Sequence, residues 1–192
     1  IQISDAALIK NRILMLDILA NNNWERPLYF TGGAQADKEY IWLKDYLQLD
    51  GLAYKFVPIK TPIADRSFMD MGRIDSEIMY NNVKKWSWKN SNADIYHDPE
   101  TRKNGISLRN SLGRLADELI KENDFAKAEE ILDMSIENMP IDKYGYFNLV
   151  IGHIESYYRI DRPEKARKIT EFLVNNFRER IYYFSGLDSY EI

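Results

Sequence analysis

"NSLGRLADELIKENDFAKAEEILDMSIENMP", Asn110 to Pro140, is the stretch that decides the fold of this chain. Its apolar residues recur at intervals of three and four, which is the spacing of an amphipathic helix. Asp124 and Phe125 interrupt this pattern and predict a turn, so the stretch predicts two antiparallel helices. Leu112, Leu115, Ala116 and Leu119 are expected to line the inner face of the first helix.

The helical hairpin has a second, weaker copy in the sequence. Ala128 lies at the close-packing position of the first copy, and Ala166 lies 38 residues further on, near the ~34-residue period of tetratricopeptide repeats. Such hairpins have an apolar face that they can bury only by stacking. We therefore predict tetratricopeptide-like hairpins over residues 101–192, with residues 182–192 as a tail or capping segment.

The N-terminal third predicts a small α/β unit. A first helix is expected from Ser4 or Asp5 to about Ala20, and its wide apolar stripe indicates packing on more than one side. Residues 28–30 and 52–58 predict strands, and residues 37–49 predict a helix between them. These segments predict a βαβ unit with parallel strands, covered on one face by the first helix.

The predicted fold class is thus α+β or α/β, with three regions. Residues 1–66 are expected to form the βαβ unit, residues 67–100 a connecting helix and loop, and residues 101–192 the helical hairpins. Gly51 has the place of a helix C-cap glycine after residue 49. In the connecting region a helix is expected from Asp75 to Trp86, and Asp98-Pro99 predicts the start of the next helix.

Composition excludes several classes of function. The 192 residues include 45% hydrophobic and 29% charged side chains, which is ordinary for a globular protein. A net charge of −4, without a polybasic block, argues against nucleic-acid partners. The absence of cysteine excludes disulfides and thiolate metal sites. No apolar run reaches the ~20 residues of a membrane helix, and since the chain begins at Ile1 rather than Met we expect it to be part of a longer protein.

The first candidate binding site is the end of the first predicted strand. Thr31, Gly32 and Gly33 could present backbone N–H groups to an anion, as glycine turns after parallel strands do. The alternative is a tight turn without a ligand, since no G-x-G-x-x-G motif or P-loop lysine is present. Trp24 and Arg26 flank the entrance of this strand, where they could stack on a ligand or fasten the first helix to the sheet.

A second candidate site is the aromatic pair Trp86 and Trp88, which could form a platform for a sugar or could be hydrophobic anchors. The two histidines, His97 and His153, lack the i, i+4 partner of a helical metal site. The sequence offers no assembled catalytic set, and we expect no cofactor and no metal.

The order of the motifs "ANNNWERPLYFTGG" (20–33), "GLAYKFVPI" (51–59) and "SLRNSLGRLADELI" (107–120) resembles a known family. It is similar to the C-terminal soluble region of Bacteroidetes-type, protein O-mannosyltransferase-like multi-pass membrane proteins. "WSWKN" (86–90) departs from the motif of aromatic residues and glycine that is expected at this place in that family. The resemblance implies a parent that transfers lipid-linked sugars, with its catalytic half embedded in the membrane and no catalytic residue in this chain.

Two functions follow from the resemblance and the hairpins. In the first, the chain is a periplasmic accessory domain whose partners are its own membrane-embedded half and an acceptor polypeptide. In the second, it is a stand-alone protein-interaction scaffold unrelated to sugar transfer. A third reading, an enzyme that uses Gly32-Gly33 to hold a nucleotide or phosphate, has the least support in the sequence.

Overall fold

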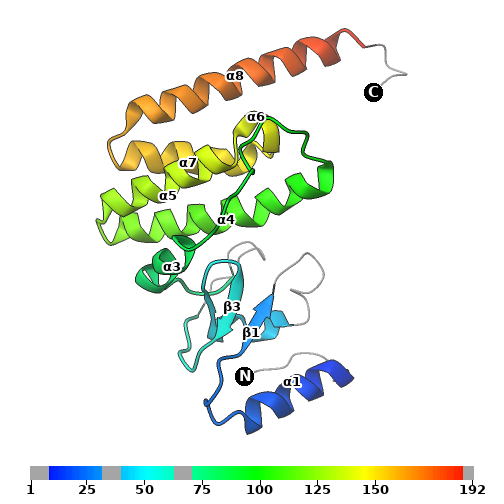
Figure 1. The fold of residues 1–192 in the computed structure, drawn as a ribbon, viewed down its shortest axis with the longest axis vertical. Coiled ribbons are helices and arrows are strands. Elements are labelled where there is room, and N and C mark those ends of the chain that lie inside the picture. Colours follow the sequence, from blue (N-terminus) through cyan, green and yellow to red (C-terminus); the bar gives the residue numbers. More distant parts are fainter. Residues whose placement is uncertain (1–8, 32–39, 63–70, 188–192) are drawn as a thin grey trace. The chain divides into compact units, whose positions relative to one another are not determined.

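The computed structural model describes residues 9–31, 40–62 and 71–187 (Figure 1). The chain divides into two compact units, Ile1–Ser87 and Trp88–Ile192, which we call unit 1 and unit 2. The mixture of helices with a small sheet confirms the α+β class. Each unit is described by itself below.

Unit 1 contains a small sheet and short helices. They are α1 (Lys10–Asn21), β1 (Tyr29–Thr31), the 3-10 helix η1 (Ile41–Tyr46), β2 (Leu47–Leu49), β3 (Ala53–Phe56) and α3 (Ser76–Val83).

The sheet is antiparallel, so the predicted parallel βαβ unit is wrong. The strand order is β1-β3-β2, and Tyr54 of β3 faces Phe30 on one side and Leu49 on the other. The reason is a tight hairpin between β2 and β3. The Asp50 N–H donates to the carbonyl of Ala53 over 3.0 Å, and Gly51 takes a positive φ of 108°, which glycine adopts without steric cost.

The hairpin also corrects the helix expected over residues 37–49. Residues 32–39 lie outside the described part of the chain, and the rest of that segment is the 3-10 helix η1 followed by strand β2. Gly51 is therefore a hairpin glycine rather than a helix C-cap. On the other side of β2 a single parallel bridge joins Gln48 to Arg73.

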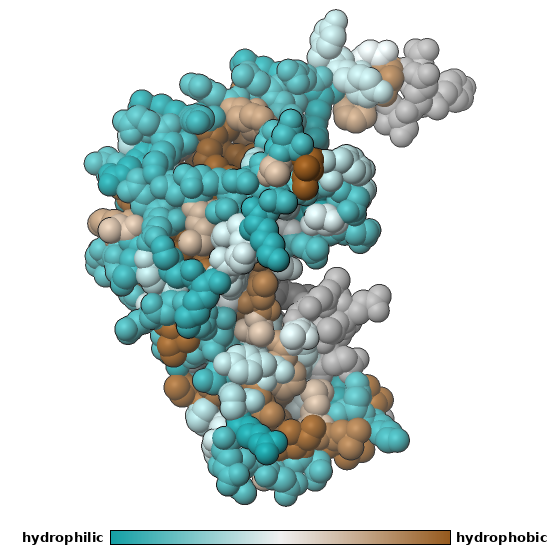
Figure 2. All heavy atoms as spheres, viewed as in Figure 1, coloured by the Kyte–Doolittle hydropathy of each residue, from teal (hydrophilic) through white to brown (hydrophobic). Residues whose placement is uncertain are grey.

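Helix α1 does not cover the sheet as expected. None of its residues is buried, although Leu19 packs beside the core cluster of unit 1. Ile13, Leu14 and Ile18 are each more than half exposed, and Figure 2 shows hydrophobic side chains gathered over this helix. The predicted packing of α1 on more than one side is thus wrong, and its expected caps Ser4 and Asp5 lie outside the described residues.

The core of unit 1 is made by the sheet, by η1 with the residue before it, and by the segment ahead of α3. Its buried cluster brings side chains from η1, β2 and β3 together with one from the segment before α3: Tyr40, Leu43, Leu47, Phe56 and Met71. The helix expected from Asp75 to Trp86 is present as α3, which ends at Val83, and Asp75 is its N-cap, whose carboxylate accepts the N–H of Ile78 at 3.1 Å.

Unit 2 is a stack of helices, and the two antiparallel hairpins expected from the sequence are present (Figure 1). The first hairpin packs α4 against α5, the second packs α7 against α8, and α7 also packs on α4. The helices are α4 (Pro99–Lys121), α5 (Phe125–Asn138), the short α6 (Ile141–Tyr144), α7 (Asn148–Arg159) and α8 (Pro163–Ser185).

Local signals in the sequence explain where these helices begin. Asp98 accepts the N–H groups of Glu100 and Thr101, at 2.9 and 3.1 Å, and caps α4 ahead of Pro99. The close-packing residues Ala128 and Ala166 have no exposed surface. Helical hairpins are therefore confirmed, while their assignment as tetratricopeptide repeats stays a prediction.

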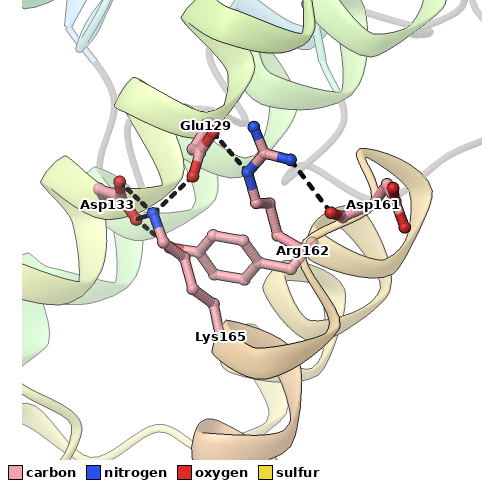
Figure 3. A network of polar contacts seen from close by, with 6 residues as sticks. Glu129, Asp133, Asp161, Arg162 and Lys165 are labelled. Carbon is pink, nitrogen blue, oxygen red and sulfur yellow. Dashed lines mark hydrogen bonds and ion pairs between the residues drawn. The ribbon is translucent and has the colours of Figure 1, made fainter.

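A polar network joins the two hairpins (Figure 3). Lys165 of α8 contacts Glu129 at 2.7 Å and Asp133 at 2.6 Å, both on α5. Arg162 donates to the second oxygen of Glu129 at 2.8 Å, and Tyr157 of α7 donates to Asp133 at 2.9 Å. The hydrogen bond from Lys165 is the main reason that the pKa of Glu129 is lowered. Paired charges of α5 and the start of α8, with the hydrogen bond from Tyr157 of α7, fix the register of the stack.

Candidate functional site

Helix α8 is much longer than its partner in the hairpin. It has 23 residues, whereas α7 has 12. Because the two helices are antiparallel, the C-terminal part of α8 extends past the start of α7, as Figure 1 shows. Residues 182–185, expected to belong to a tail, continue α8 as helix.

The extended part of α8 carries an apolar stripe. Phe177, Ile181 and Phe184 follow one another at i, i+4 and i+7, so they lie on one face of the helix. Their exposed fractions are 39%, 68% and 53%. Large apolar side chains in such a row are normally covered, which marks this face as an interaction surface.

A groove lies beside this stripe. Its larger part has a volume of about 490 Å³, and a second hollow of about 340 Å³ shares Arg180 with it. The larger volume is in the range of ~300–1,000 Å³ typical of ligand pockets. Both parts together form what we call the α8 groove, which is lined by Ile106, Tyr146, Phe147, Asn148, Leu149, Phe177, Glu179, Arg180, Tyr183 and Phe184.

Phe147 is the rigid centre of the α8 groove. Its ring meets Phe177 edge-on at 5.6 Å and Phe172 edge-on at 6.3 Å between centroids. The guanidinium of Arg180 lies over the same ring, 4.9 Å from its centroid. Cation–π contact and the packed aromatic rings hold Arg180 in one position without using its N–H donors.

Arg180 has no ion-pair partner within the described part of the chain. This distinguishes it from Lys165 and Arg162, whose charges are paired with carboxylates of α5. A guanidinium presents five N–H donors and favours a bidentate carboxylate. The α8 groove therefore combines a mainly apolar surface with one oriented positive charge, Arg180, and with the carboxylate of Glu179 in its second part.

The first set of residues predicted from the sequence lies in unit 1. Trp24 stacks on Phe56, with 5.6 Å between centroids and 7° between planes, and Arg26 is exposed. Thr31 is exposed at the end of β1, while Gly32 and Gly33 lie outside the described residues. Because β1 pairs antiparallel, the argument for an anion site after a parallel strand no longer applies.

The second predicted set is the pair Trp86 and Trp88. Trp86 packs over the β2–β3 turn, where a Cβ on Gly51 would lie 3.1 Å from the ring, so it anchors the hairpin of unit 1. Trp88 is half-buried and belongs to unit 2. The two rings are thus in different units.

Two buried titratable side chains of unit 2, Arg109 and His153, are engaged within the protein. Arg109 donates to the carbonyls of Met139 and Gly145, and Nε2 of His153 lies 2.9 Å from Oγ of Ser135. Both side chains are at most 2% exposed. A ligand in the α8 groove would not reach them, so we assign them to the architecture.

Residues 1–78 match the family model of TMEM260-associated domain 2. The matched part comprises α1, the sheet and the beginning of α3, which is less than half of the chain. The match fits the expected relation to protein O-mannosyltransferase-like membrane proteins. No curated protein and no solved structure matches the chain.

Two further findings concern the described residues alone. No helix among residues 9–31, 40–62 and 71–187 has both the length and the hydrophobicity required to cross a bilayer. Within the same ranges, no three His, Asp or Glu side chains lie together in a way that could hold a metal ion.

Sequence reasoning missed the α8 groove, although one signal for it was present. Phe177, Ile181 and Phe184 keep helical spacing beyond the point where α7 can cover them. The residues contributed by α4 and by the start of α7 could not have been found, because they come together only through the stacking of the two hairpins.

Proposed function

We propose that this chain is a non-catalytic accessory domain of a membrane glycosyltransferase-related protein, located on the periplasmic side of the inner membrane. The match of residues 1–78 supports the relation to such a parent. In this proposal unit 1 is the part that identifies the parent protein, and the membrane-embedded half of that parent is its first partner.

Unit 2 binds a polypeptide in this proposal, and the observation that carries it is the α8 groove. Its lining is mainly aromatic and aliphatic, with a single oriented cation. Aromatic residues and arginine are the side chains that dominate the binding energy of protein interfaces. A polypeptide that accepts sugar, or one that docks the enzyme on its substrate, fits such a surface.

A panel of ligands tests the binding role. We expect saturable binding of peptides rich in apolar residues, measured by fluorescence anisotropy, and no saturable binding of nucleotides or sugar phosphates. The Phe177→Ser variant is the control for the place of binding. If this variant no longer binds the peptide, the peptide-binding site is the α8 groove. Binding of a nucleotide or sugar phosphate with no response to any peptide would contradict the proposal.

The alternative is a stand-alone helical scaffold, since residues 79–192 lie outside the family match. The reading frame upstream of Ile1 distinguishes the membrane-bound parent from the stand-alone scaffold. A membrane-bound parent requires several apolar runs of ~20 residues there. An upstream frame that encodes only polar or globular segments would favour the scaffold and would refute the membrane-bound parent.

A further inference from the structure

We propose that the α8 groove recognises a polypeptide segment with one internal aspartate or glutamate flanked on both sides by apolar residues. This inference rests on the proposed polypeptide-binding function and specifies its ligand. The carboxylate pairs with Arg180, and the apolar residues contact the two parts of the groove.

The carboxylate follows from the state of Arg180. Its guanidinium is stacked on Phe147, 4.9 Å from the ring centroid, and it has no ion pair with a described residue. Stacking uses the face of the guanidinium and leaves its edge available for a bidentate contact. A cation that is already oriented loses less entropy on binding, which favours affinity.

The internal position of the carboxylate follows from where Arg180 lies. The larger part of the groove, with Ile106, Tyr146 and Leu149, is on one side of it. Tyr183 and Phe184 line the other part, together with the exposed Glu179. A chain that ended at Arg180 would leave one of these apolar parts uncovered. A segment that continues past Arg180 covers both, and this favours an acidic side chain over a terminal carboxylate.

The length of the apolar surface indicates the form of the ligand. Phe177, Ile181 and Phe184 extend over two turns of α8, about 10 Å along its axis. An amphipathic segment of a partner presents apolar anchors over such a distance, as in helix-in-groove recognition. The predicted ligand is therefore a short amphipathic segment rather than a single residue.

The test uses labelled peptides of about 12 residues, in which one central glutamate is flanked by leucine and phenylalanine. We expect Arg180→Glu to weaken binding by about tenfold or more, because hydrogen bonds between charged groups are the stronger class. Replacing the peptide glutamate with glutamine should weaken binding to the unaltered chain to a similar extent. A peptide with a central lysine should bind the Arg180→Glu variant better than the unaltered chain.

Arg178→Glu is the matched control. It makes the same change of charge two residues away, where the side chain points to a different side of α8. Arg178 is exposed and lies outside the groove lining, so peptide affinity should be kept. Equal losses of peptide affinity in the two variants, or unchanged peptide affinity in Arg180→Glu, would overturn this inference and leave the polypeptide-binding function intact. If no peptide of the set binds the unaltered chain, both proposals fail.

Discussion

Replacing Arg109 with alanine is expected to lower the free energy of unfolding by about 3 kcal/mol, the largest loss we predict for a single side chain. Arg109 is the largest fully buried side chain of the described residues. It donates to the carbonyl of Met139, at the end of α5, and to that of Gly145 at 3.3 Å, at the end of α6. Helix-end carbonyls have no partner within their own helix, and alanine would leave both unpaired beside a cavity.

The loss is smaller than the sum of these effects, because burial of the guanidinium has a cost of its own. Burial lowers the pKa of Arg109 to about 10, so the side chain is charged at neutral pH at an energetic expense. Arg109→Met removes that expense as alanine does, but it also fills part of the cavity, so we expect a smaller loss of about 1 kcal/mol. Urea unfolding followed by circular dichroism measures both, with exposed Arg178→Ala as control. An Arg109→Ala variant as stable as the control would contradict this account.

The stability of unit 2 is expected to fall by about 2 kcal/mol between pH 7.5 and pH 5, because His153 must stay neutral in the folded chain. Complete burial, and then the positive charge of Arg109, lower its pKa from 6.5 to about 3. The unfolded chain protonates this histidine as the pH falls below about 6.5, while the folded chain does not. The contribution of neutral His153 to the free energy of unfolding is therefore fully present above pH 6.5, and it decreases as the pH falls toward about 3.

His153→Gln should make the urea midpoint independent of pH in this window. Glutamine retains a group that can hydrogen-bond Ser135, which lies 2.9 Å from the histidine ring. The chain has two histidines, so His97→Gln is the matched control and should retain the pH dependence. A flat profile in the unaltered chain, or one abolished by the His97 change alone, would show that His153 is not the group responsible.

The helical part of the fold could be predicted because its signals are local. Asp98-Pro99 and Asp124 mark helix starts, and Ala128 and Ala166 mark where helices touch. Each of these signals acts within one or two helical turns. The helices of unit 2 consequently have the expected order and pairing.

The sheet was predicted wrongly because its pairing depends on one turn. Asp50-Gly51 is a recognised hairpin signal, yet the apolar residues before it also fit a helix, and Gly51 was assigned to a helix end. Once the turn is a hairpin, β2 and β3 must be antiparallel and the crossover helix disappears. The exposure of Ile13 and Ile18 on α1 could not be inferred either, since an apolar stripe in sequence does not tell what lies opposite it.

The central claim is that this chain binds a polypeptide in the α8 groove. The peptide titration, followed through the amide chemical shifts of the protein by NMR, tests it most directly. The account predicts shifts that grow with peptide concentration at residues 146–149 and 177–184 and little change in unit 1. Shifts confined to unit 1, or spectra unchanged at saturating peptide, would contradict it.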